Sequence, residues 1–236
     1  MNIMPLLVAV VAFLPPVLVW FFTLRPYDLL LNMKRLTVFF VVGLGLGCIS
    51  AFAQLMVMGP MGLNEFIITG IVGYVIGFSI VESLLKVIIF NFPSLANRYE
   101  SSFEATVFGA AFGSGFPLVF FAGIVRNQGA IDTLEGATLF GLCLAGAILH
   151  ASLGILVARG SQTADMWWWG MRAIMLQIPF NLMLFFWWHN APMYYVLIGA
   201  IPYALMVWWK SQRVLKDSIP REAIKKAQRE AKALYR

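Results

Sequence analysis

The chain has 236 residues, of which 61% are hydrophobic and only 12% are Asp, Glu, Lys or Arg, about half the charged share of a soluble domain. Its mean hydropathy of +0.82 excludes a soluble enzyme. The net charge of +6 does not indicate a nucleic-acid partner, because nine of the 17 basic residues lie in residues 210–236.

Seven apolar segments follow one another along the chain, at residues 3–23, 36–58, 65–92, 103–124, 136–158, 171–189 and 193–209. A bilayer core of about 30 Å needs roughly 20 residues of helix, and only the last two segments are short for this. The sequence therefore predicts an all-α, polytopic membrane protein. About seven transmembrane helices in residues 1–209 would be surrounded by membrane lipids.

The remaining residues, 210–236, form a basic tail. From Pro220 onward the tail is predicted to be helical, since proline is favoured in the first turn of a helix. Its cations fit the anionic headgroups of a membrane surface. A solvated charged helix that only fixes the topology is the alternative.

The basic residues also predict the orientation in the cell membrane. With the N-terminus outside, the inner segments carry the tail together with Arg25, Lys34, Arg35, Arg98, Arg159 and Arg172. The outer loops then carry only Arg126. Short cytoplasmic loops are enriched in Lys and Arg, so a multi-pass topology with an outer N-terminus and a cytoplasmic C-terminus is expected.

Three glycine patterns fall inside the apolar segments: Gly43-x-Gly45-x-Gly47, Gly73-x-x-x-Gly77 and Gly109-x-x-x-Gly113-x-Gly115. Small residues at such spacings let transmembrane helices approach closely. They are interpreted as packing faces rather than as ligand sites.

Glu82 and Lys86 form an ionisable pair inside the apolar segment 65–92. Each charge costs roughly 2.5–3.5 kcal/mol on insertion scales, and such residues usually face the bundle interior and mark function. A structural i,i+4 ion pair, with Glu before Lys, is the alternative.

His150 is the third ionisable group inside a span. Glu82 lies about 16 Å before Pro93 and His150 about 13 Å before Arg159, at a rise of roughly 1.5 Å per residue. This matched depth on two helices predicts a shared site that activates water or binds a metal or a proton. A satisfied structural histidine is the alternative. Gln54, Gln177 and Asn181 are the amides inside spans.

Glu104 has two interpretations. Ser101-Ser102-Phe103-Glu104 fits a capping box, with Ser101 at the N-cap and Glu104 at the third helical position. A catalytic role for the Glu104 carboxylate is the alternative.

Three stretches together carry a family resemblance: Glu82-Ser83-Leu84-Leu85-Lys86, the glycine-rich run from Glu104 to Phe116, and His150-Ala151. They resemble the PrsW-like intramembrane proteases, a branch of the CAAX-processing (Abi-type) glutamate intramembrane proteases. The resemblance covers a core of roughly residues 65–160. It implies a peptidase, hence a hydrolase, that acts on a transmembrane or membrane-proximal polypeptide.

The resemblance implies that Glu82 is the water-activating base and His150 its partner, with Lys86 and Glu104 as further candidate catalytic residues. A divalent metal such as zinc, if bound, would be held by Glu82 and His150. A catalytic zinc usually has three protein ligands, and Glu104 is the only further candidate.

Two positions depart from the family's pattern. Its first motif, Glu-Glu-x-x-Lys, has Ser83 here in place of the second Glu, and its second motif has Phe120 where a Glu follows Phe116 by four residues. A catalytically inactive pseudoprotease or membrane assembly subunit is therefore an alternative function. A small proton- or ion-coupled transporter is another.

Overall fold

A computed structural model of the chain describes residues 4–58, 71–128, 133–188 and 193–234. These residues contain no strand, which confirms the expected all-α class. The elements are α1 (Met4–Leu24), the 3₁₀ helix η1 (Arg25–Leu30), α2 (Met33–Met58), the π-helix η2 (Ile71–Gly77), α4 (Phe78–Phe90), α5 (Glu100–Gly113), α6 (Gly115–Gln128), α7 (Thr133–Thr163), α8 (Met166–Trp188), α9 (Met193–Ser218) and α10 (Arg221–Leu234).

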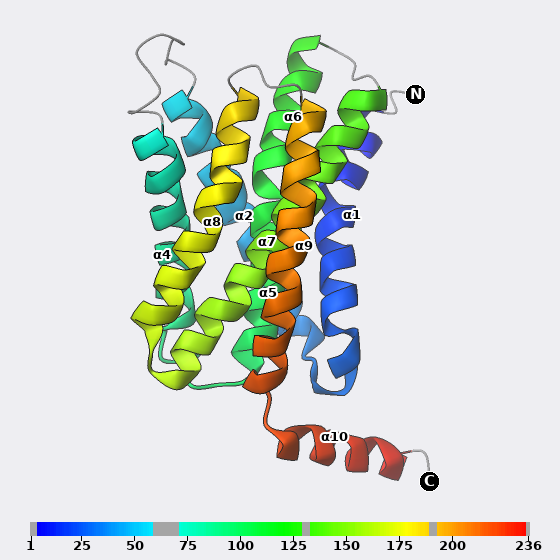
Figure 1. The fold of residues 1–236 in the computed structure, drawn as a ribbon. Helices are drawn as coiled ribbons and strands as arrows, with labels where there is room; N and C mark the ends of the chain where they lie inside the picture. The colour runs from blue at the N-terminus through cyan, green and yellow to red at the C-terminus, as the bar shows by residue number, and fades with distance from the viewer. Residues whose placement is uncertain (1–3, 59–70, 129–132, 189–192, 235–236) are drawn as a thin grey trace.

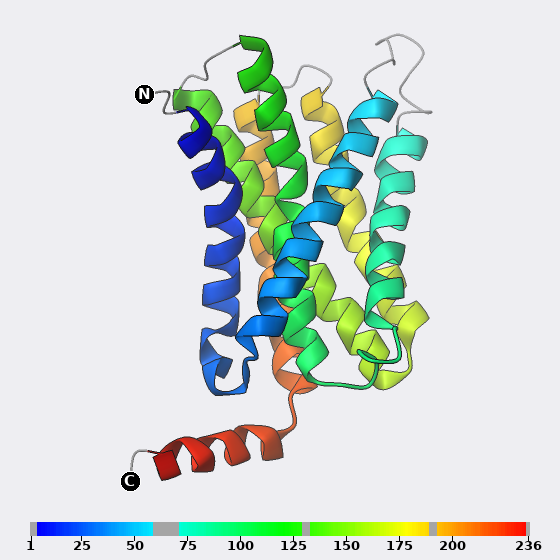
Figure 2. The same cartoon turned by 180° about the vertical axis from the view of Figure 1, so that it is seen from behind.

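The long helices run side by side along one axis, and α10 lies across one end of the bundle (Figures 1 and 2). Five helical stretches of the described chain are long and apolar enough to cross a membrane: Val10–Leu30, Met33–Val57, Val72–Phe90, Glu100–Phe120 and Gly136–Thr163. The expected total of seven spans stays a prediction.

The outer faces of the bundle are apolar, as a bilayer requires. Large side chains such as Phe22, Val41, Ile49 and Ile88 are more than 60% exposed. Contiguous exposed apolar surface on this scale is rare on soluble monomers and marks contact with a membrane or a partner. Together with the apolar helices, it identifies a membrane-embedded protein.

α7 is the central helix, and glycines bring α5 close to it. A Cβ on Gly109 would lie 2.1 Å from the His150 carbonyl oxygen, and one on Gly113 would lie 2.2 Å from that of Gly146. On the other side of α5, a Cβ on Gly47 of α2 would lie 2.3 Å from the Phe112 carbonyl oxygen. These contacts confirm the packing role of two of the three glycine patterns.

Within those patterns, an added Cβ on Gly45 or Gly73 would have no described atom within 4 Å, and one on Gly77 would meet, among the described residues, only the carbonyl oxygen of Val72. The packing interpretation is therefore wrong for Gly73 and Gly77. Both residues belong to the π-helix η2 instead, a rare geometry that often accompanies functional sites.

Two predicted segments have different bounds. The segment 103–124 is interrupted at Ser114, between α5 and α6, although Glu100–Phe120 still forms one stretch long and apolar enough to span a membrane. The tail was expected to begin at residue 210, but α9 continues to Ser218. Only α10, which starts directly after Pro220 as predicted, forms a separate basic helix.

Candidate functional site

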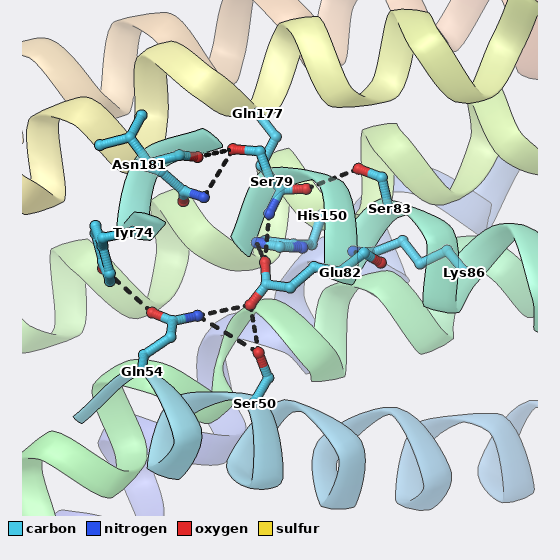
Figure 3. A network of polar contacts seen from close by, with 11 residues as sticks. Ser50, Gln54, Tyr74, Ser79, Glu82, Ser83, Lys86, His150, Gln177 and Asn181 are labelled. Atoms are coloured by element: carbon cyan, nitrogen blue, oxygen red, sulfur yellow. Dashed lines mark hydrogen bonds and ion pairs between the residues drawn. The ribbon is translucent and has the colours of Figure 1, made fainter. Parts of the chain in front are cut away.

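The Glu82 carboxylate lies in the middle of the bundle, at 3% exposure, and accepts hydrogen bonds from two neighbouring helices. Ser50 Oγ and Gln54 Nε2, both on α2, each donate to Glu82 Oε1 at 2.6 Å. Gln177 Nε2 of α8 donates to Glu82 Oε2. A buried charge normally needs such partners, and here hydroxyl and amide dipoles supply them (Figure 3).

A second set of side chains orients these donors. Tyr74 of η2 donates its hydroxyl to Gln54 Oε1 at 3.2 Å, which fixes the amide with its nitrogen toward Glu82. Ser83 donates to Gln177 Oε1 at 3.1 Å in the same way. Farther along α8, Asn181 Nδ2 donates to Ser79 Oγ at 3.0 Å. The network thus joins α2, η2, α4 and α8.

His150 of α7 faces Glu82 from the opposite side. Its Nε2 lies 3.9 Å from Glu82 Oε2, which is too long for a direct hydrogen bond. Its Nδ1 is buried and has no hydrogen-bond partner among the described residues, and its ring packs on Phe112 with 5.2 Å between the ring centroids. The predicted meeting of Glu82 and His150 is confirmed, and the imidazole retains unused hydrogen-bonding capacity.

Lys86 is fully buried but does not approach the carboxylate. Its Nζ donates to the backbone carbonyl of Glu82 at 3.1 Å and lies 4.3 Å from the centroid of the Phe112 ring. No ion pair within 4.0 Å joins Lys86 to Glu82 in the described part of the chain, so the structural ion-pair interpretation is wrong.

Glu82 and His150 both line a small cavity. The space open to the centre of a water-sized sphere is about 20 Å³, against the ~10–15 Å³ needed for one water. Its wall also holds the amides of Gln54 and Asn181, and the rest is mainly apolar, with Phe116, Pro117 and Phe180 as examples. The site can hold a water molecule, whereas a peptide bond needs more room.

Glu104 lies elsewhere, and its predicted capping role is wrong. α5 begins at Glu100, after a Tyr99 whose backbone is already helical and whose side chain caps nothing. Ser101 is therefore inside the helix, and its hydroxyl donates to the Leu95 carbonyl. Glu104 Oε1 instead forms a 2.8 Å ion pair with Arg35 Nε of α2.

The Arg35–Glu104 pair lines a separate cavity of about 150 Å³, together with Asn32, Arg98 and Glu100. Glu104 Oε2 is buried there, and no residue in the described part of the chain forms a hydrogen bond with it. Of the four residues expected to be catalytic, the structure thus brings Glu82 and His150 together at one cavity, whose described lining includes neither Lys86 nor Glu104.

The donor set does not fit a catalytic metal. No group of three His, Cys, Asp or Glu residues comes together anywhere in the described ranges. Glu82 and His150 would supply two ligands, whereas catalytic zinc usually has three from the protein. Moreover, hydroxyl and amide donors already occupy both Glu82 oxygens.

The sequence prediction missed Ser50, Tyr74 and Ser79. A periodic signal was present, because Ser50 and Gln54 are four residues apart, and Ser79, Glu82, Ser83 and Lys86 recur at spacings that share one helix face. Gln177 and Asn181 also follow this spacing. A polar stripe on each of three apolar helices is the pattern that would have found the network.

Comparison with known proteins adds no family. No protein-family model, no curated protein and no solved structure matches the chain.

Proposed function

We propose that the chain is an intramembrane peptidase-like protein in which Glu82 and His150 hold a water molecule against a membrane-embedded polypeptide. The observation that carries the proposal is a cavity of about 20 Å³ lined by both Glu82 and His150, whose Oε2 and Nε2 atoms are 3.9 Å apart on different helices. A carboxylate and an imidazole on either side of a water are a suitable pair for general acid–base hydrolysis.

The two carboxylate oxygens have different roles in this proposal. Oε1 accepts two hydrogen bonds, from Ser50 and Gln54, which hold the carboxylate in place. Oε2 accepts one, from Gln177, and so retains a lone pair that faces the cavity and can take a proton from water. His150 faces the same water and can donate to the carbonyl oxygen on which negative charge develops.

The substrate reaches this water through the apolar side of the cavity. Phe116 and Pro117 lie at the start of α6, next to the break at Ser114. A helix interrupted at this point can move α6 without moving α5. An apolar wall that opens toward lipid selects a transmembrane or membrane-proximal polypeptide rather than a soluble one.

The test is cleavage of a panel of single-span peptides co-reconstituted with the protein in liposomes, with the products identified by mass spectrometry. Glu82→Gln keeps the shape of the side chain and removes the base, so the rate should fall by roughly 10²–10⁴-fold. The cleavage rate of His150→Ala should fall by a similar factor. Glu104→Gln is the matched control, since it neutralises a buried carboxylate outside the cavity. Full activity of Glu82→Gln would refute the catalytic proposal.

A second candidate function is a non-catalytic binder of membrane polypeptides. The observation that favours it is that Phe120, where the resembled family has a carboxylate, stacks on Phe116 with 6.3 Å between ring centroids. The cavity therefore has an apolar wall at this place. A photo-cross-linking residue placed at position 116 tests this function. It would be established if no peptide were cleaved and the same peptides were cross-linked both with the native Glu82 and in Glu82→Gln.

A further inference from the structure

A groove on the outside of the bundle, far along the chain from Glu82, combines apolar and cationic side chains. It lies between α7, α8 and α9 and has a volume of about 810 Å³. Leu156, Met175, Leu176 and Val207 contribute to its apolar lining, while Arg172 and Lys210 are the charged residues that line it. Its volume is typical of a site for a small organic molecule, roughly 300–1,000 Å³.

The two cations of the groove are not neutralised by the protein. The ion pairs of the described chain are Arg35–Glu104, Arg98–Glu100, His150–Glu82 and Lys226–Glu230, so neither Arg172 nor Lys210 takes part in one. No acidic side chain belongs to the described lining. Both side chains are exposed, and an anion that enters the groove would meet two positive charges.

Arg172 is also held in position. Its guanidinium lies 4.3 Å from the centroid of the Trp168 ring and 4.9 Å from that of Trp169. Stacking on aromatic rings occupies the faces of a guanidinium and leaves its N–H edge free for bidentate contact with phosphate. The arginine is thus preorganised for an anion, which lowers the entropy lost on binding.

The position of the groove identifies the anion. α8 begins at Met166 and α9 ends at Ser218, directly before the basic helix α10, so Arg172 and Lys210 lie toward the end of the bundle that α10 crosses (Figure 1). Tryptophan and basic side chains together are typical of the headgroup level of a membrane. From this level the apolar lining continues along the helix axes toward the middle of the membrane, the depth at which lipid acyl chains lie.

We propose that this groove is a specific site for an anionic phospholipid of the surrounding bilayer. The phosphate lies between Arg172 and Lys210, and an acyl chain lies along Met175, Leu176 and Val207. The site is independent of the Glu82 cavity, and it exists whether or not the protein cleaves polypeptides.

The test is native mass spectrometry of the purified protein, titrated with dioleoyl phosphatidylglycerol or with dioleoyl phosphatidylcholine. These two lipids share their acyl chains and differ in headgroup charge. We expect phosphatidylglycerol to bind at least about tenfold more tightly, because two cations each contribute about fivefold near an anionic headgroup. Equal binding of the two lipids would overturn the proposal.

Variants separate the groove from the general basic surface. Arg172→Gln and Lys210→Gln should each weaken phosphatidylglycerol binding about fivefold. Arg213→Gln is the matched control, because Arg213 also stacks on a tryptophan, Trp209 at 4.5 Å, but does not line the groove. All three positions are exposed, so folding should be retained. An equal loss in Arg213→Gln would show that only overall charge matters.

Two further measurements test the lipid's identity. Met175→Trp fills the groove at a position that is 59% exposed, without any change of charge, and should weaken phosphatidylglycerol binding. Undiminished binding would overturn the acyl-chain contact. Inorganic phosphate should not displace the bound lipid, whereas displacement would show that the site recognises a phosphate ion only.

Discussion

Glu82 and Glu104 are both buried carboxylates, at 3% and 2% exposure, but their charges are balanced in different ways. Glu104 has a cation, Arg35, at 2.8 Å. Glu82 has hydroxyl and amide donors and, at 3.9 Å, an imidazole. The nearest buried ammonium, on Lys86, donates to a backbone carbonyl instead.

The difference separates a structural group from a chemically available one. An ion pair fixes the charge of its carboxylate and joins two helices, α2 and α5 in the case of Glu104. Dipoles stabilise the Glu82 carboxylate without neutralising it, and they leave one side of it open to a water-sized cavity. Ionisable groups of this second kind inside a membrane protein are the ones expected to act on a substrate or a proton.

The largest effect should come from Gly109, at the close contact between α5 and α7. In Gly109→Ala the added Cβ would lie 2.1 Å from the His150 carbonyl oxygen, a backbone atom that cannot move aside cheaply. Overpacking of this kind should cost about 3 kcal/mol of unfolding free energy and displace His150 from Glu82.

Gly45→Ala is the control for this change, since nothing lies within 4 Å of its Cβ. It should raise stability by about 0.5–1 kcal/mol, because alanine favours a helix interior over glycine. Reversible denaturation in mixed detergent micelles measures both variants. If they were equally stable, α5 and α7 would not approach as closely as the structure shows.

Removal of Arg35 should be the next most damaging change. Arg35→Ala leaves the Glu104 charge buried without its ion-pair partner, which costs roughly 3–5 kcal/mol for a fully buried pair. Here about 2–3 kcal/mol is expected, because Arg35 is 34% exposed and Arg98 lines the same cavity. The double variant Arg35→Ala/Glu104→Gln should recover part of the loss. A double variant as unstable as Arg35→Ala would contradict the charge explanation.

Truncation of Glu82 should have a somewhat smaller effect on stability. Glu82→Ala leaves Ser50, Gln54 and Gln177 without their acceptor, and polar contacts between membrane helices average about 0.6 kcal/mol each, so a loss of about 2 kcal/mol is expected. Glu82→Gln retains one acceptor oxygen and should lose less than half as much. The same denaturation experiment tests this order, and a Glu82→Gln variant that is the less stable of the two would reverse it.

The sequence alone predicted those features of the site that depend on how deep a residue lies along its transmembrane helix. Apolar segments located the helices, and depth arithmetic placed Glu82 and His150 at the same level, where the structure has them in contact. The direction in which a side chain points around its helix was not used. The i,i+4 spacing does put Lys86 on the Glu82 face of α4, but it does not fix the rotamer, and the ammonium lies over Phe112.

The failures at Glu104 and Ser114 have a different origin. Ser101 to Glu104 satisfies a local capping pattern, but the chain enters α5 with Tyr99 already helical, at φ −68° and ψ −30°. Arg35 lies far away in the sequence, so no local pattern could reveal it as the partner. At Ser114 the sequence did hold a signal that was not used, because Pro117 has no N–H to donate to the Gly113 carbonyl and so interrupts a helix there. The close contacts of Gly113 with α7 and of Gly115 with α2 could be seen only in the structure.

The smallest effect, in the opposite direction, is expected at Lys86. Its ammonium is fully buried, makes one hydrogen bond to a carbonyl and rests on the Phe112 ring at 4.3 Å. Exchange of a buried charge for an apolar side chain of similar shape is often neutral or stabilising, so Lys86→Met should raise stability by up to about 1 kcal/mol. Leu85→Met, at the neighbouring half-buried position, controls for the added methionine. A loss above about 2 kcal/mol in Lys86→Met would mean that the ammonium balances the Glu82 charge after all, and the contrast between Glu82 and Glu104 would then disappear.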